Sequence, residues 1–246
     1  MQQLSINFYP TFKCQLSCGH CMHNCDKSSS QYSDKRYQYI INFLDSLYQF
    51  NNFSLYIQIS GGEPTIYPRF RDLCFDICKL KTHLHIACVE LTTNGMQPIN
   101  LNNFKIFHNI RVSLDPFHDE KVGLEKIKEN LDTFIAHAHD VQLESRVLYM
   151  LKGRALKNKH LFVDEQAITT CLVKRASRPQ IIFFPHAIGF CPDSSIHSEN
   201  PNATIPYDNK YILNPELLIE KSIEFYNNKA GKCQNGKACG FHALKQ

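Results

Sequence analysis

Residues 4–21 have the sequence Leu4-Ser-Ile-Asn-Phe-Tyr-Pro-Thr-Phe-Lys-Cys-Gln-Leu-Ser-Cys-Gly-His-Cys21, and they give the strongest indication of the fold. The first six residues alternate between apolar and polar side chains, which predicts a β-strand from Leu4 to Tyr9. A loop follows in which Cys14, Cys18 and Cys21 are spaced Cys-x3-Cys-x2-Cys. Three thiolates this close together can hold three irons of one cluster and leave another iron open for a different ligand. The stretch therefore predicts a reaction centre at the end of the first strand.

Strands and helices alternate along the rest of the chain. Apolar patterns predict strands at 53–59, 86–92, 110–114, 141–151 and 181–184, and helices at 34–50, 68–80, 120–138 and 215–227. Ser33 and Asn214 are the predicted N-caps of two of these helices. Strands separated by helices are usually parallel, with right-handed crossovers. The predicted fold class is therefore α/β, a partial (β/α)6 barrel of parallel strands followed by a short irregular C-terminal extension.

The unusual residues of the chain follow the predicted strands directly. The cysteine loop comes after the first strand, Gly61-Gly62-Glu63-Pro64 after the second, Thr93-Asn94-Gly95 after the third and Asp115 after the fourth. In barrels and open α/β sheets, chemistry takes place at the carboxyl ends of the strands. The positions of these residues therefore predict one functional site, built from four consecutive strand ends.

Length and composition suit an ordinary globular protein. The 246 residues, of which 43% are hydrophobic and 20% charged, fit one domain with a small appendage, which we place at 1–165 and 166–246. No apolar run approaches the roughly 18 residues that a transmembrane helix needs. The first residues lack the pattern of a secretion signal, so we expect a cytoplasmic protein without a membrane partner. A net charge of +4 from scattered basic residues does not favour a nucleic-acid partner.

Eleven cysteines are unusual for a chain of this kind. In a cytoplasmic protein they indicate metal binding or catalysis rather than disulfides. The spacing of Cys14, Cys18 and Cys21 differs from that of bacterial ferredoxins. A closed zinc site needs four ligands and could recruit Cys25 or His20. From the cysteines alone, an iron–sulfur cluster and a small zinc site both remain open.

Two motifs together resemble the radical S-adenosylmethionine (radical SAM) enzymes. That family carries Cys-x3-Cys-x2-Cys after its first barrel strand, often with an aromatic residue before the last cysteine, where this chain has His20. It also carries Gly-Gly-Glu-Pro after the second strand, present here as Gly61-Gly62-Glu63-Pro64. The resemblance implies a [4Fe–4S] cluster on the three cysteines. It also implies that the Glu63 carboxylate, or nearby carbonyls, accept from the methionyl ammonium of SAM.

Weaker similarities to the family extend the resemblance to roughly residues 4–150. Thr93-Asn94-Gly95 looks like the turn after the family's third strand, and Ser113-Leu114-Asp115 is similar to its Ser-x-Asp segment on the fourth. The resemblance implies polar contacts to the ribose and carboxylate of SAM from Thr93, Asn94, Ser113 and Asp115. Arg146, a polar residue in an apolar run, could clamp the SAM carboxylate.

The C-terminal region is similar in part to SPASM and twitch extensions, which carry auxiliary iron–sulfur clusters. The similarity lies in the apolar stretch 181–191, which ends in Gly-Phe-Cys191. It implies a possible second cluster on Cys171, Cys191, Cys233 and Cys239. A single zinc site or unrelated free cysteines are the alternatives. The sequence predicts that Cys74, Cys78 and Cys88 belong to the core, because buried free cysteine behaves as a small hydrophobe.

The resemblance implies an enzyme that cleaves SAM reductively at a [4Fe–4S] cluster, giving a 5′-deoxyadenosyl radical that abstracts hydrogen from a substrate. We favour a peptide or protein substrate, because such extensions are common in relatives that modify peptides. A small molecule, a tRNA or a glycyl-radical activase role are the enzyme alternatives, and a zinc-binding module is the non-enzyme one. Expected partners are SAM and an electron donor such as flavodoxin or ferredoxin. His118, Asp119, Glu120 and Tyr149 lie near the expected mouth, and nothing ranks them as catalytic residues.

Overall fold

The computed structural model describes most of the chain. The described residues are 1–21, 23–50, 52–102, 104–144, 148–150, 168–170, 176–191, 204–207, 210–211, 214–229 and 239–243. For 119–121, 148–150, 168–170, 204, 229 and 239–243 only the backbone is described.

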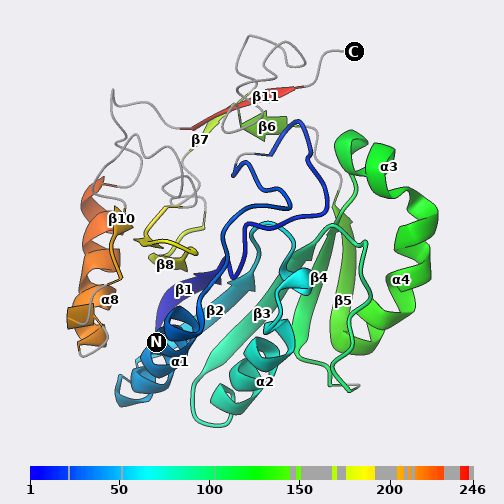
Figure 1. Cartoon of the computed structure of the whole chain (residues 1–246). Helices are drawn as coiled ribbons and strands as arrows, with labels where there is room; N and C mark the ends of the chain where they lie inside the picture. Colours follow the sequence, from blue (N-terminus) through cyan, green and yellow to red (C-terminus); the bar gives the residue numbers. More distant parts are fainter. Residues whose placement is uncertain are drawn as a thin grey trace.

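One large sheet organises this part of the chain (Figure 1). Its order is β10 (Thr204–Ile205), β9 (Ile188–Gly189), β8 (Gln180–Phe183), β1 (Gln2–Phe8), β2 (Phe53–Ile59), β3 (Ile86–Thr93), β4 (Phe107–Ser113) and β5 (Ala138–Glu144). The pairs from β8 through β1 to β5 are parallel, whereas β9 and β10 are antiparallel. The predicted α/β class with a mainly parallel sheet is confirmed, and the last parallel strand lies next to the first.

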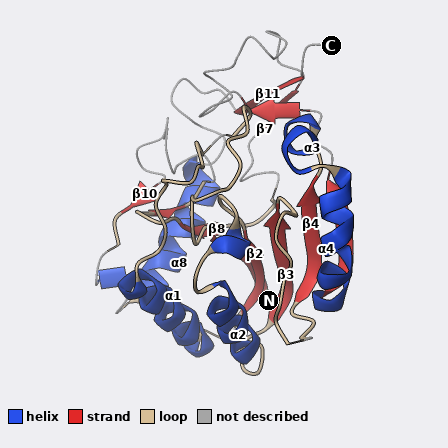
Figure 2. Ribbon diagram, turned by 45° about the vertical axis from the view of Figure 1, so that its right-hand side comes forward, coloured by secondary structure: helices blue, strands red, loops and turns tan. Residues whose placement is uncertain are grey.

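Helices cover one face of this sheet (Figure 2). They are α1 (Asp34–Ser46), α2 (Phe70–Leu80), α4 (Leu124–His137) and α8 (Pro215–Glu224). The side chains that β1 to β3 turn toward this face are fully or almost fully buried: Leu4, Ile6, Phe8, Leu55, Ile57, Ile59, Val89 and Leu91. Burial of this apolar surface is the main stabilising contribution to the fold.

The helix predictions are largely confirmed, with corrections at the ends. The side chains of Ser33 and Asn214 accept from backbone N–H groups as predicted N-caps. The first helix ends at Ser46 and continues only as a 3-10 turn, η1 (Leu47–Gln49). The helix predicted at 120–138 is wrong as a single element. It is α3 (Pro116–Val122) followed by α4, and they meet at Gly123, whose φ of 74° lies in the left-handed region that interrupts a right-handed helix.

A second, three-stranded sheet lies beyond the carboxyl ends of the large one (Figures 1 and 2). Its order is β6 (Leu148–Met150), β11 (Cys239–Ala243) and β7 (Ile168–Thr170), and both pairings are antiparallel. Two predictions are corrected here. The strand predicted at 141–151 is divided between β5 and β6 in different sheets, and the tail predicted to be a loop contains β11. This sheet joins residues from both sides of the boundary at 165/166, which stays a prediction.

The cysteines predicted to be structural lie in or against the core. Cys74 is 1% exposed on α2, and Cys78 packs against the same core from one turn further on. Cys88 on β3 is half-buried. None of the described helices is long and apolar enough to cross a membrane.

Candidate functional site

The cysteine loop and the Gly-Gly-Glu-Pro segment are bonded to each other at the carboxyl edge of the sheet. The backbone N–H of Gly62 donates to the carbonyl of Thr11 at 2.8 Å, and that of Glu63 donates to the carbonyl of Lys13 at 2.8 Å. Lys13 directly precedes the first cysteine of the loop. Figure 1 shows the loop, in dark blue, running above the ends of the parallel strands. The segment that follows β2 therefore fixes the path of the backbone just before Cys14.

The two glycines are required by this close approach. A Cβ atom on Gly62 would lie 2.2 Å from the carbonyl oxygen of Lys13. One on Gly61 would lie 2.5 Å from the carbonyl oxygen of Thr11, and the φ of Gly61 is 128°. Backbone atoms cannot move aside as a flexible side chain can, so only glycine fits here.

The side chain of Glu63 joins the second strand end to the third. Its carboxylate is fully buried and accepts four hydrogen bonds. Oε1 accepts from the backbone N–H and hydroxyl of Thr65 and from the hydroxyl of Thr93 at 2.8 Å, and Oε2 accepts from the backbone N–H of Asn94 at 2.7 Å. Burial raises the pKa of this carboxyl, although the hydrogen bonds act in the opposite direction.

Replacing Glu63 with Gln is expected to destabilise the cofactor-free protein by about 1–3 kcal/mol, because an amide N–H₂ would face a backbone or hydroxyl donor. For a chain of this size that corresponds to a fall in Tm of roughly 2–12 °C, measured by circular dichroism. The control is Glu129→Gln on the exposed side of α4, where the ion pair with Lys126 is worth at most about 1 kcal/mol. Equal Tm values for both variants would show that the buried carboxylate does not join the strand ends.

The described cysteines of the loop form no disulfide and are mostly buried. Cys14, Cys18 and Cys25 are 9%, 5% and 2% exposed, and Cys21 is partly exposed. Burial raises the pKa of the Cys14 thiol to about 11. An apolar and aromatic set packs around the loop and screens it from water: Tyr9, Phe12, Leu16, Ile182 and Phe184. A metal ion that binds such a thiol deprotonates it outright.

Nitrogen donors already point at two of the cysteine sulfurs. The backbone N–H of Leu16 donates to Sγ of Cys14 at 3.4 Å, and the backbone N–H of Cys25 donates to Sγ of Cys21 at 3.3 Å. Such donors stabilise a metal-bound thiolate. The residues therefore fit a metal cluster held by the loop.

Two histidines and a buried aspartate border Cys18. Ligand atoms of Cys18, His20 and His118 lie within 4.8 Å of one another. Oδ2 of Asp115 accepts from Nδ1 of His118 at 2.9 Å and lies 3.7 Å from Nε2 of His20. Burial alone would raise the pKa of Asp115, but the hydrogen bond from His118 and the charges of both histidines lower it below its usual value.

The sequence did not predict that His20, Asp115 and His118 form one group. Part of the group has a local signal in the sequence, because Asp115 directly precedes Pro116, as an N-cap does. In the structure, Oδ1 of Asp115 accepts from the backbone N–H groups of Phe117 and His118 at the start of α3. His20 comes from a different loop, and no local pattern indicates that contact.

Four residues predicted to contact SAM lie at two neighbouring strand ends, and a fifth lies outside the described residues. Thr93, Asn94, Ser113 and Asp115 are buried at the carboxyl ends of β3 and β4. Thr93, Asn94 and Asp115 already have protein partners for their polar groups. Arg146 lies outside the described residues, so its predicted role stays a prediction.

The predicted auxiliary cysteines are described only in part. Cys191 is partly buried and packs against the main core. Cys171 and Cys233 lie outside the described residues, and Cys239 is described only as backbone at the start of β11. Their assignment to a second cluster stays a prediction.

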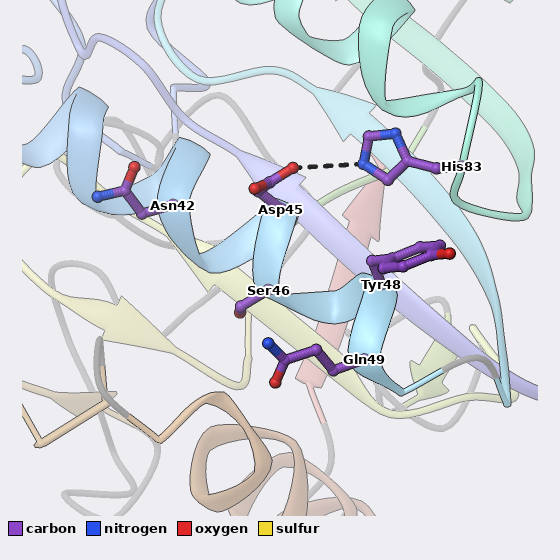
Figure 3. Close-up of a pocket in the computed structure, with 6 residues that line it drawn as sticks. All are labelled: Asn42, Asp45, Ser46, Tyr48, Gln49 and His83. Carbon is purple, nitrogen blue, oxygen red and sulfur yellow. Dashed lines mark ion pairs between the residues drawn. The ribbon is translucent and has the colours of Figure 1, made fainter.

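A surface hollow of about 380 Å³ lies at the opposite end of the sheet (Figure 3). It is lined by Asn42, Asp45, Ser46, Tyr48, Gln49 and His83. Asp45 and His83 form an ion pair of 3.3 Å across it. These residues come from α1, η1 and the turn before β3, where the strands begin, and none belongs to the four strand-end motifs. The hollow is therefore separate from the candidate site.

Comparison with known proteins supports the interpretation of the motifs. Residues 8–153 match the family described as the radical SAM superfamily. Mycofactocin maturase MftC of Mycobacterium ulcerans is 32% identical over 88 residues, and its counterpart from Mycobacterium tuberculosis is 31% identical. The first match covers 35% of this chain and 21% of the maturase, so the chain spans only about a fifth of that relative's length.

Two solved structures share the fold over nearly the whole chain. BtrN in complex with AdoMet and 2-DOIA superposes with a TM-score of 0.56 at 12% identity, covering 94% of this chain and 91% of BtrN. Histidine-tagged anSMEcpe with bound AdoMet gives a TM-score of 0.56 at 14% identity, covering 92% of this chain and 80% of that protein.

Proposed function

Since the chain belongs to the radical SAM superfamily, we propose that Cys14, Cys18 and Cys21 hold its [4Fe–4S] cluster and that the neighbouring strand ends hold SAM beside it. The protein is a radical SAM enzyme. The observation that carries the proposal is the pair of backbone hydrogen bonds that join Gly62 and Glu63 to the start of the cysteine loop. In this family, reductive cleavage of SAM depends on an electron that the bound cluster supplies.

The methionyl ammonium of SAM is assigned to backbone carbonyls of the segment 60–64. Both carboxylate oxygens of Glu63 already accept hydrogen bonds from Thr65, Thr93 and Asn94. The side chain therefore supports the segment, and the carbonyls of Gly61, Gly62 and their neighbours remain the acceptors near Cys14. Pro64 begins the short 3-10 turn η2 (Pro64–Ile66), which ends this segment.

The ribose and carboxylate of SAM are assigned to the fourth and fifth strand ends. Ser113 is the last residue of β4 and pairs with Glu144 of β5, and β4 also pairs with β3, so Ser113 lies at the carboxyl edge of the sheet between these two strands. Asp115 positions His118, and Arg146 two residues beyond β5 is the proposed partner of the SAM carboxylate.

The proposed substrate is a peptide or protein. The curated relatives that match the chain over 88 residues are maturases, which supports a substrate of that class. A second cluster on Cys171, Cys191, Cys233 and Cys239 is part of this proposal, because auxiliary clusters accompany such extensions. Electrons are proposed to come from a flavodoxin or ferredoxin.

The experiment incubates the anaerobically reduced enzyme with SAM and synthetic peptides encoded by neighbouring genes, and reads the mass of each peptide. A loss or exchange of hydrogen, with equivalent formation of 5′-deoxyadenosine, is expected. The Cys14→Ala/Cys18→Ala/Cys21→Ala variant is the control. Turnover of a small molecule without any change in a peptide would contradict the proposed substrate class. An iron count of about eight per chain supports two [4Fe–4S] clusters, and about four contradicts the second.

A further inference from the structure

The side chain of Asn94 lies against the first cysteine of the loop. Its Nδ2 is 3.7 Å from Sγ of Cys14, within hydrogen-bonding distance for sulfur, and 3.4 Å from Oε1 of Gln15. Asn94 is 4% exposed and Cys14 is 9% exposed, so water competes little for this contact. The Asn94 side chain thus donates to one of the three cysteines proposed to hold the cluster.

The orientation of the amide is fixed by its surroundings. Oδ1 of Asn94 accepts from the backbone N–H of Met96 at 3.0 Å, so the NH₂ group must face the sulfur. The backbone N–H of the same residue donates to Glu63 at 2.7 Å. Asn94 is therefore held at both its backbone and its side chain before any ligand binds.

Hydrogen bonds to the sulfurs of an iron–sulfur cluster help to set its reduction potential. A donor to a cysteine sulfur stabilises the reduced cluster more than the oxidised one, because the reduced cluster carries one more negative charge. A second donor, the N–H of Leu16, reaches the same sulfur at 3.4 Å but belongs to the backbone and cannot be removed by substitution. The side chain of Asn94 is thus the donor to Cys14 that a substitution can remove.

We propose that Asn94 is a positioning residue that raises the reduction potential of the cluster by donating its side-chain N–H to Cys14. This inference rests on the proposed function, because it requires Cys14 to bind the cluster. It gives Asn94 a role that differs from the SAM contact implied by the sequence resemblance. The residues that follow β3 then adjust the reduction potential of the cluster, while those that follow β2, β4 and β5 bind SAM.

The test is an EPR-monitored redox titration of the cluster without SAM, in the wild type, Asn94→Ala and Asn94→Asp. Asn94→Asp keeps the Oδ1 acceptor for Met96, and its ionised carboxylate replaces the N–H donor with a negative charge. Both variants are expected to have a lower reduction potential of the cluster. At a fixed solution potential, the ratio of reduced to oxidised cluster therefore falls by about threefold or more. The signal that disappears in the triple cysteine variant identifies the relevant cluster. EPR detects only loaded protein, so poor loading does not hide the effect.

Gln15→Ala is the matched control. It removes the other partner of the Asn94 amide and leaves the contact with Cys14, so the potential is expected to stay at the wild-type value. Wild-type potentials in both Asn94 variants would overturn this inference. An unchanged potential with a raised KM for SAM would overturn it in favour of direct SAM binding. Absence of any cluster that depends on the three cysteines in the wild type would instead contradict the proposed function itself.

Discussion

Replacing Cys14, Cys18 or Cys21 with Ala is expected to lower the formation of 5′-deoxyadenosine from SAM by more than about 100-fold, because even residues outside the ligand set of a metal site cost 10–100-fold. Each substitution removes one of the three thiolates that bind three of the irons, whereas the remaining iron is open for SAM. Activity is measured anaerobically with dithionite, and iron is measured in the same samples. The triple variant is expected to retain only auxiliary iron.

Cys25→Ala is the matched control for this prediction. Cys25 lies in the same loop, is 2% exposed, and donates its backbone N–H to Cys21, a bond that alanine preserves. A [4Fe–4S] site with an open iron does not use this thiol, so iron content and activity are expected to remain within about threefold of the wild type. A zinc site on four cysteines predicts the reverse. Full iron retention in the triple variant, or loss of metal in Cys25→Ala, would show that the ligands are assigned wrongly.

Replacing Gly62 with Ala is expected to reduce cluster content by about tenfold or more, although Gly62 has no side chain with which to bind the cluster. The added Cβ would lie 2.2 Å from the Lys13 carbonyl oxygen. The Cβ is bonded directly to the backbone and the oxygen belongs to it, so neither can move away unless the backbone moves. Relief of the clash breaks the 2.8 Å bond from Glu63 to Lys13 and displaces Cys14. Iron per chain after anaerobic reconstitution is the measurement.

Gly123→Ala separates this effect from the general cost of replacing glycine. Nothing lies within 4 Å of a Cβ at Gly123, and its φ is 74°, so the substitution has only the conformational cost of about 1–2 kcal/mol. A lower Tm with normal iron content is expected for Gly123→Ala. Normal iron content in Gly62→Ala as well would contradict the close packing of the two loops.

The sequence predicts the fold well where local patterns decide it. Strand β2 was predicted at its observed bounds, because its apolar and polar residues alternate and Gly61-Gly62 ends it. The strand after α4 was misplaced, because the helix ends at His137 and β5 begins at the next residue without a loop between them. Strand β11 exists through pairing with β6 and β7, which are distant in sequence, so no local pattern reveals it.

The same distinction applies to the site. The motifs located the strand ends correctly, since each motif is a short run of residues that follows a strand. Their contacts depend on how the loops cross in space. Thr93 and Asn94 are predicted contacts to SAM, which stays a prediction, and no local pattern indicates their hydrogen bonds to Glu63 and Cys14. The group of His20, Asp115 and His118 likewise depends on the meeting of two loops.

In the proposed site, Cys14, Cys18 and Cys21 hold a cluster whose remaining iron binds SAM. The most direct measurement is electron–nuclear double resonance of the reduced enzyme with SAM that carries ¹⁵N in its amino group or ¹⁷O in its carboxylate. Hyperfine coupling of both labels to the cluster is expected in the wild type, and it should be absent in the Cys18→Ala variant. A reduced cluster that is present in the wild type but shows coupling to neither label would contradict binding of SAM to the open iron.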